Sequence, residues 1–183
     1  WSDKLAAKPP DADTQTAIAL ATPVGMTNLL KAIRAQIDSN PVTKGRVGLA
    51  YTEWMFSGGR QLPIQGIPTP EGPHRGNLGG AIIAAGWMNM LLSQADFIPI
   101  STMSSLMGGA NLTAGSGIRK QDALVWPSPQ YWLFWLYSHR AGDTVVASET
   151  AVRHYDVHNG LVSMPEIPDV PYLDVLATRY SAS

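Results

Sequence analysis

The sequence predicts an α/β fold that is followed by a tail of β-strands alone. Over residues 1–141, helical patterns alternate with short apolar runs of strand length. Beyond Gly142 only strand-like segments remain, separated by a proline-rich connection. Alternation of this kind is typical of a parallel sheet with right-handed crossovers, so we expect the tail to form an added layer or a second domain.

The first half of the chain is expected to form a helix, a strand and a second helix. Residues 1–15 are polar and predict an irregular lead-in. Thr22 is expected to cap the first helix, with Pro23 at its first position, because apolar residues then recur at helical spacing. The expected elements that follow are a strand over 46–53, a long loop over 57–75 and a largely buried helix over 77–94.

The second half is expected to continue with a buried strand over 96–105 and a helical turn at 104–108. A glycine-rich excursion at 108–117 leads to the apolar run 123–126. Ser128 and Pro129 match the cap and the first position of a third helix. The tail is then expected to hold strands over 144–152 and 170–180.

Composition excludes several classes of function. The chain has 183 residues, 45% of them hydrophobic, and a net charge of -1, so no field draws nucleic acid or an anionic membrane. Without cysteine there is no thiolate metal site, and we predict neither a metal nor a cofactor. The longest apolar stretch, 81–92, is too short to cross a bilayer. Cytoplasmic and secreted locations both stay open, and a chain that begins with Trp1 is expected to be part of a longer protein.

Glu53 is the first candidate for chemistry. In a regular strand it shares one face with Val47, Leu49 and Tyr51, where an unpaired carboxylate costs free energy. The carboxyl ends of parallel strands are where ligands bind, so Glu53 is a candidate catalytic residue. A structural carboxylate bonded to an arginine or to loop amides is the alternative, and spacing alone does not decide between them.

Several motifs, taken in order, resemble glycoside hydrolase family 51. "RVGLAYTEW" resembles the strand that ends in Glu-Trp in that family, and "GGAIIAAGWMNMLLSQADFIPISTMSSLMGG" resembles the helix and strand that follow. "SPQYWLFWLYSHRAGDTVV" and "VPYLDVLATRY" resemble two later segments of the same family. The likeness covers roughly residues 17–180, and its consistent order is more specific than any single motif.

The resemblance implies the C-terminal part of a (β/α)8 TIM barrel at 1–141, followed by strands of a jelly-roll β-sandwich at 142–183. It also implies that Glu53 is the nucleophile of a retaining α-L-arabinofuranosidase. The sequence contains no Asn-Glu pair, the family's acid/base motif, so the acid/base is expected on a companion polypeptide that carries the rest of the barrel. A homo-oligomer is a further possibility, and the expected substrate is an oligosaccharide or polysaccharide.

Trp54, Trp126, Gln130 and Tyr131 are the candidate substrate-binding residues, although Trp54 could instead fill a core. Two departures from the family, Met55 after Glu-Trp and the spacing around Trp126, leave an endo-β-glucanase or xylanase activity open. From a different class, a non-catalytic carbohydrate-binding remnant is the alternative. Most aromatic residues of the third helix are expected to pack in the core. His154 and His158 are expected to have a structural role, and Glu71 and His74 are expected to lie on the long loop.

Overall fold

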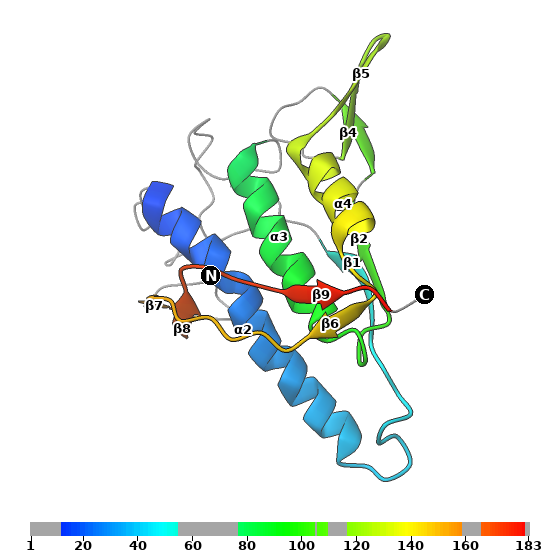
Figure 1. Ribbon diagram of the computed structural model, residues 1–183, viewed down its shortest axis with the longest axis vertical. Helices are drawn as coiled ribbons and strands as arrows, with labels where there is room; N and C mark the ends of the chain where they lie inside the picture. Colours follow the sequence, from blue (N-terminus) through cyan, green and yellow to red (C-terminus); the bar gives the residue numbers. More distant parts are fainter. Residues whose placement is uncertain (1–11, 55–76, 105, 110–116, 159–165, 182–183) are drawn as a thin grey trace, which may run out of the picture.

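A computed structural model describes residues 12–54, 77–104, 106–109, 117–158 and 166–181. Within these ranges three long helices, α2, α3 and α4, alternate with nine short strands. Figure 1 shows the three helices side by side, with the C-terminal strands crossing in front of α2 and α3. The loop that we expected over 57–75, with Glu71 and His74, lies outside the described residues.

The first unit is a strand, a helix and a parallel strand. β1 (Ala50–Trp54) pairs in parallel with β2 (Ile100–Met103), and α3 (Leu78–Leu92) connects them in sequence. The predicted alternation is therefore confirmed, although both strands are shorter than expected. β2 begins late because the amides of Phe97 and Ile98 bond to the carbonyl of Gln94 and so continue the turn after α3.

One hydrophobic cluster joins this unit to α2 and α4. Its members are buried, and they come from all three helices, from β1 and from the turn before β2. They are Ala19, Leu30, Trp54, Ile83, Ala84, Trp87, Met90, Leu91, Phe97, Ile98 and Leu133. Burial of this much apolar surface on one side fixes the helices against the β1–β2 pair. No helix among the described residues covers the other side of the pair.

α2 (Ala12–Asp38) begins eleven residues before Pro23, its expected first position, so the prediction that Thr22 caps it is wrong. The Thr22 hydroxyl donates to the carbonyl of Ile18 at 3.1 Å, and Pro23 lies inside the helix. Proline in a helix interior costs about 3 kcal/mol. Packing offsets this cost, because Pro23 is buried at the place where α2 crosses Gly86 of α3.

By length and composition alone, α2 would be able to cross a membrane, with a mean hydropathy of 1.2 over its most apolar window. The core helix of a soluble protein passes the same test. α2 packs against α3, β7 and β8, and this packing buries Ile18, Ala19, Ala21 and Leu30.

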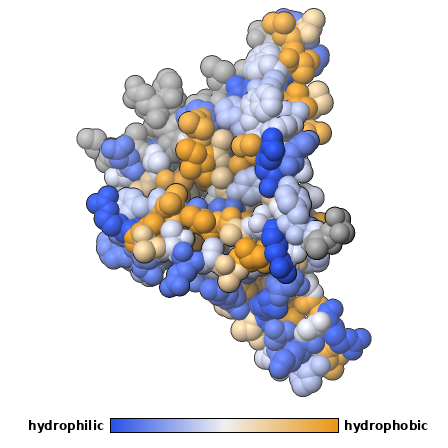
Figure 2. Space-filling model, in the orientation of Figure 1, coloured by the Kyte–Doolittle hydropathy of each residue, from blue (hydrophilic) through white to orange (hydrophobic). Residues whose placement is uncertain are grey.

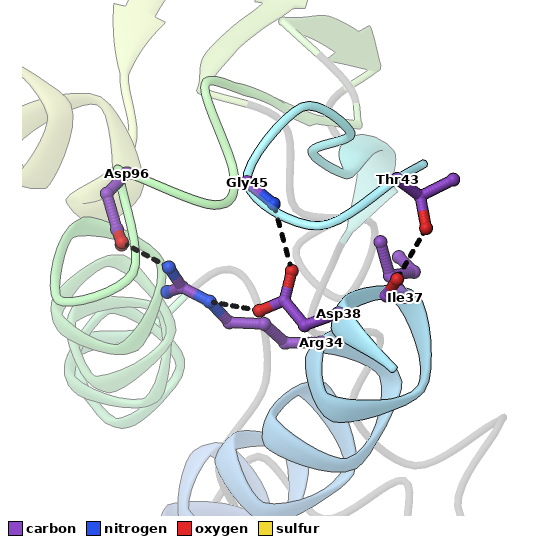
Figure 3. Close-up of polar contacts among 6 residues, drawn as sticks. All are labelled: Arg34, Ile37, Asp38, Thr43, Gly45 and Asp96. Atoms are coloured by element: carbon purple, nitrogen blue, oxygen red, sulfur yellow. Dashed lines mark hydrogen bonds and ion pairs between the residues drawn. The ribbon is translucent and has the colours of Figure 1, made fainter. Parts of the chain in front are cut away.

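A polar network closes the connection from α2 to β1 (Figure 3). Arg34 contacts the Asp96 carboxylate at 2.7 Å and the Asp38 carboxylate at 3.8 Å. Asp38 accepts from the amide of Gly45 at 3.2 Å, and the Thr43 hydroxyl donates to the carbonyl of Ile37 at 2.5 Å. Gly45 has φ +64, a conformation that glycine adopts at little cost. The network thus ties the C-terminal end of α2 to the turn before β2.

α3 and α4 (Pro129–Arg140) begin where the sequence predicts. Asn77 caps α3 by accepting from the amide of Gly80, and Ser128 caps α4 by accepting from the amide of Tyr131. Pro129 occupies the first turn of α4, where its missing N–H is not needed. Local capping chemistry is therefore enough to place both N-termini.

A three-stranded sheet replaces the helical turn that we expected at 104–108. β3 (Met107–Gly109) pairs in parallel with β4 (Ile118–Gln121), which pairs antiparallel with β5 (Leu124–Pro127). The prediction of a helical turn is wrong because the backbone of this segment bonds to a strand more than ten residues later. Such a partner leaves no signal in local spacing.

The described residues of the C-terminal part form strands alone, as predicted, arranged as two antiparallel pairs, although the strand expected over 144–152 covers only 144–146. β6 (Thr144–Val146) pairs with β9 (Ala177–Arg179), and β7 (His154–Val157) pairs with β8 (Ile167–Pro171). A second hydrophobic cluster, with Val157, Ile167 and Val170, packs β7 and β8 on Ile18 and Ala21 of α2. The run predicted as one strand over 170–180 is two strands with a turn between them.

Gly142 marks the passage from α4 to these strands. A Cβ atom at this position would lie 2.2 Å from the carbonyl carbon and oxygen of Arg179, so only glycine fits. Its amide donates to the Thr178 hydroxyl at 2.8 Å. The first residue of the predicted second part is therefore packed tightly against the end of β9.

The segment from β8 to β9 crosses α2 and α3 and is held there by polar side chains. The Tyr137 hydroxyl donates to Asn89 at 2.5 Å, and the Asn89 amide donates to Asp174 at 2.9 Å. Burial, and secondly the charge of Asp174, raise the pKa of Tyr137. Hydrophobic residues gather in a band across the middle of this face (Figure 2). These contacts connect α4, α3 and the C-terminal strands.

Candidate functional site

Glu53 lies at the carboxyl end of β1, where the strand departs from regular pairing. Tyr51 pairs with Ser101 and Trp54 pairs with Met103, so Thr52 and Glu53 together stand opposite the single residue Thr102. One extra residue in β1 makes this a β-bulge, a feature that re-aims side chains beside active sites. The alternation of faces that the sequence predicts therefore holds only as far as Tyr51.

The bulge changes which residue lies on the helix-covered face. Tyr51 and Trp54 both contact the ring of Trp87 in α3, with centroids 6.2 Å apart in each case. Residues three apart in a regular strand lie on opposite faces. The expectation that Glu53 shares a face with Tyr51 is thus wrong, because the extra residue puts Trp54 on that face instead.

The other face of the β1–β2 pair is here called the open face. It carries Ala50, Thr52, Glu53, Ile100 and Thr102, all of which are exposed. Among the described residues, the Glu53 carboxylate has no hydrogen bond and no ion pair. The donors that we expected around a catalytic carboxylate, and the arginine or amides of the structural alternative, are therefore both missing from this part of the chain.

Trp54 lies in the core rather than on a surface that a ligand could reach. Its side chain is 5% exposed and stacks on Trp87 and on Phe134 of α4, with interplanar angles of 11° and 26°. The indole N–H donates to the Ser101 hydroxyl at 2.8 Å. Of the two interpretations of Trp54, core filling describes its position, because both ring faces and its one donor are occupied.

The other three candidate residues gather where β5 meets α4. Trp126 is half-buried and stands opposite the buried Arg119 across the β4–β5 ladder, and burial lowers the pKa of Arg119. Gln130 is 1% exposed, and its carbonyl oxygen has no hydrogen bond among the described residues. Tyr131 is half-buried beside Trp132. No contact among the described residues joins this group to Glu53, so its role in substrate binding stays a prediction.

The aromatic residues of α4 divide between its two faces. Phe134 and Tyr137 pack on the core, as we expected for this helix. Trp132 is 50% exposed, and the rings of Trp132, Trp135 and His139 follow one another along the outer face. Among the described residues, the prediction of packed aromatic residues therefore holds for the inner face of α4 alone.

His154 and His158 form cross-strand pairs in the C-terminal part. His154 contacts Asp169 at 2.7 Å, and His158 contacts Glu166 at 2.9 Å. Each pair joins β7 to β8 or to its ends, which is the structural role that we expected. Among the described residues no group of three or more metal-ligating side chains is close enough to hold an ion.

A cavity of about 520 Å³ lies between α2, α3 and the segment that leads to β9. Its walls are mainly apolar and include Leu20, Ile83 and Leu176, with Asn89 and Asp174 at one side. None of the candidate site residues lines it. The cavity is therefore separate from the open face.

Sequence reasoning missed Ser101 and Thr102, which contact Trp54 and Thr52 beside Glu53. A weak signal was present, because "STMSS" places hydroxyl side chains in a strand that otherwise reads as buried. Hydroxyls in such a strand need hydrogen-bond partners. The sequence could not show that their partners lie in β1.

Comparison with models of known protein families shows which family this chain belongs to. The model of the α-L-arabinofuranosidase C-terminal domain family matches residues 61–168, which is more than half of the chain. The chain belongs to this family. The resemblance to glycoside hydrolase family 51 seen in the sequence is thereby confirmed. The matched region begins after Glu53 and runs through the predicted domain boundary at 142, so it tests neither of these two predictions.

Solved structures of arabinofuranosidases share the fold. The family 51 α-L-arabinofuranosidase from Thermotoga petrophila is 21% identical with a TM-score of 0.65, over 87% of this chain and 31% of that one. The enzyme from Thermotoga maritima, in its arabinose complex, is 21% identical with a TM-score of 0.67, over 88% and 32%. A family 51 enzyme from Bifidobacterium longum is 18% identical with a TM-score of 0.61, over 92% and 32%. Comparison with curated proteins finds no match.

This arabinofuranosidase family member thus spans about a third of the length of the structures that it matches. Identities of this size establish a shared fold. They leave the reaction, the substrate and the assembly of the present chain to be inferred from its own residues.

Proposed function

We propose that the chain is the C-terminal portion of a retaining glycosidase, an α-L-arabinofuranosidase, in which Glu53 is the nucleophile. The observation that carries the proposal is the position of Glu53. It is exposed at the carboxyl end of a parallel strand, on the face that the helices leave uncovered. In the proposed (β/α)8 barrel this face points toward the barrel axis, where the substrate binds.

The open face itself supports a larger barrel. Parallel sheets are normally buried on both faces, and two strands alone make a marginal sheet. Here Ile100 is 57% exposed on the open face, and within the described part of the chain β1 and β2 pair only with each other. Further parallel strands, carried by a companion polypeptide or by another part of a longer chain, would cover this surface. The antiparallel pairs β6–β9 and β7–β8 would then belong to the β-sandwich that follows the barrel.

The chemistry requires a second carboxyl group. In retaining glycosidases, two carboxyl groups about 5 Å apart share the work: one attacks the anomeric carbon, and the other protonates the leaving oxygen. Glu53 would attack and form the glycosyl-enzyme intermediate, which water then hydrolyses. The acid/base would come from the rest of the barrel. Trp126, Gln130 and Tyr131 remain the proposed substrate contacts.

Replacement of Glu53 in the complete enzyme tests the proposal. Glu53→Gln keeps the shape of the side chain but removes the nucleophilic oxygen, so kcat on an aryl arabinofuranoside should fall by about 10³-fold or more. Azide added to Glu53→Ala should restore turnover and give a glycosyl azide of inverted configuration, measured by NMR. Unchanged hydrolysis by Glu53→Gln would overturn the proposal.

The same assay separates the alternatives. An enzyme that hydrolyses aryl glucosides or xylosides faster than the arabinofuranoside, and loses this activity in Glu53→Gln, would be a glucanase or xylanase with the same nucleophile. A complete protein that binds arabinose-bearing polysaccharide but hydrolyses none of these substrates would be a carbohydrate-binding remnant.

A further inference from the structure

The bulge at Thr52 and Glu53 has a polar support that comes from the neighbouring strand. The Thr102 hydroxyl donates to the carbonyl of Thr52, at the position where the extra residue interrupts the ladder. Two residues further along each strand, the amide of Ser104 donates to the carbonyl of Trp54 at 3.0 Å, and backbone pairing resumes. The Thr102 side chain therefore takes the place of a backbone donor that the bulge removes.

Trp54 supports the bulge from the opposite face. It is held between Trp87 and Phe134, and its indole N–H is fixed by the Ser101 hydroxyl. Because this side chain fills the core, β1 cannot return to regular alternation without removing Trp54 from it. A regular strand would also turn the Glu53 carboxylate toward apolar rings, at a large cost in free energy.

We propose that Trp54, Ser101 and Thr102 form a clamp that holds the bulge and thereby positions the Glu53 carboxylate for attack. The inference rests on the proposed function of Glu53 and adds three positioning residues to it. None of the three needs to touch the substrate. Thr102 fixes the backbone just before Glu53, and Trp54 with Ser101 fixes the backbone just after it, so the carboxylate is presented on the open face in one orientation.

Positioning of this kind matters because attack on a sugar carbon is sensitive to small displacements. A shift of about 1 Å in a reacting group can cost on the order of 100-fold in rate. Catalytic side chains are normally held within about 0.5 Å by neighbours that do not react. Glu53 has no hydrogen bond of its own among the described residues, so within this part of the chain its backbone is what fixes its place.

Removal of the Thr102 hydroxyl in the complete enzyme tests the clamp. Thr102→Val is close to isosteric and lacks the donor, and Thr102→Ser keeps it. The direct readout is the rate at which an activated 2-deoxy-2-fluoro-arabinofuranoside labels Glu53, followed by intact mass. We expect Thr102→Val to label about 10 to 100 times more slowly, with KM for the aryl arabinofuranoside changed less than about 3-fold. Thr102→Ser should label at close to the original rate.

Thr43→Val is the matched control. It also deletes a threonine hydroxyl that donates to a backbone carbonyl, but at the turn after α2 (Figure 3). It should lower Tm by a similar amount and leave the labelling rate unchanged. Ser101→Ala gives an independent test from the Trp54 side, and the double variant with Thr102→Val should lose less than the product of the two single losses.

The inference fails if Thr102→Val labels at the original rate, or if Thr102→Ser is as slow as Thr102→Val. It also fails if Thr43→Val slows labelling as much as Thr102→Val does, since loss of stability would then explain both. The proposed function fails in a different way, by the absence of label on Glu53 in the unmodified enzyme. Label on Glu53 with no effect of Thr102→Val would overturn the clamp alone.

Discussion

At the scale of single residues, ion pairing at the end of α2 gives a dependence of stability on pH. The hydrogen bond from the Arg34 guanidinium, and its charge, hold the pKa of the Asp96 carboxyl below its ordinary value of 3.8. Arg34 also lies over the ring of Phe97, with its guanidinium carbon 5.4 Å from the centroid. The pair is therefore held against the core on one side, although both groups are exposed.

The sign of the effect follows from the lowered pKa. A carboxyl whose pKa is depressed by folding stabilises the folded state above its unfolded pKa, and this contribution is lost as pH falls through the folded pKa. Asp96→Asn should therefore lower Tm slightly at pH 7 and flatten the fall of Tm below about pH 4. Thermal melts from pH 3 to pH 7 measure this difference.

Arg34→Met provides the matching background for this prediction. Without the guanidinium, Asp96→Asn should have almost no further effect on the pH profile. An equally large effect of Asp96→Asn in both backgrounds would show that Arg34 is not the cause.

Single residues also show where sequence reasoning succeeds and where it fails. The position of Glu53 at the end of a strand was predicted from an apolar run that ends in a carboxylate. Its face was not, because the bulge depends on Ser101 and Thr102, about fifty residues away in sequence. The periodicity of β1 alone cannot show that two of its residues stand opposite a single residue of β2.

At the scale of elements, the N-terminal cap of α4 is a local device with a measurable contribution. Ser128 is 1% exposed, and its hydroxyl oxygen accepts from the amide of Tyr131 at 3.3 Å. Ser128→Ala should lower the free energy of unfolding by about 1 kcal/mol, because the amide of Tyr131 in the first turn of α4 would lose its hydrogen-bond acceptor. Urea titration monitored by tryptophan fluorescence measures the change.

Ser39→Ala is the control for this cap. Ser39 is exposed beyond the end of α2, where its hydroxyl donates to the carbonyl of Gln36 at 2.7 Å. Its loss should cost less than about 0.5 kcal/mol, since water can replace an exposed donor. If Ser128→Ala and Ser39→Ala lowered the free energy of unfolding equally, the Ser128 cap would stabilise α4 no more than an exposed hydroxyl does.

Elements with strong end signals were the ones that the sequence placed well. Ser128 identifies the start of α4 because capping is a local interaction, and the apolar pattern from about Asn77 identifies the start of α3, where the structure shows that Asn77 is the cap. The start of α2 was misplaced because Thr-Pro resembles a helix start, although tertiary packing keeps Pro23 inside a continuous helix. β3 was missed because its pairing partner β4 is distant in sequence.

At the scale of the whole molecule, the proposed barrel predicts that further strands associate with the open face. Ile100→Lys should leave the fold of this chain intact, because Ile100 is exposed here, but should block assembly with the rest of the barrel. Co-expression with the companion segment, followed by size-exclusion chromatography and native mass spectrometry, should show loss of the complex. The possible homo-oligomer would be seen in the same experiment.

Val42→Lys is the control for assembly. Val42 is also an exposed aliphatic residue, in the turn after α2 and away from the open face. Its substitution should leave the complex unchanged. Assembly that survives Ile100→Lys would contradict the proposal that further strands cover this face.

The family relationship was predictable because several motifs occur in one order along the chain. The β-only character of the tail was also predictable from its short, proline-separated apolar runs, whereas the pairing of its strands was not. The predicted division into 1–141 and 142–183 stays a prediction. Hydrogen bonds from Asn89 to Asp174, and from the Tyr155 hydroxyl to the carbonyl of Ala17, cross that division, and no pattern within either part indicates them.

Because of these contacts, cleavage of the chain and deletion of its last strands should have different effects on the protein. Cleavage of the peptide chain near residue 142 would leave Asn89 and Asp174 bonded and the last strands still seated on α2 and α3. A nicked molecule would then stay in one piece and keep its shape. Deletion of the same strands would instead expose the apolar walls of the cavity between α2, α3 and the segment that leads to β9. Loss of these strands should therefore destabilise the protein more than cleavage of the chain does.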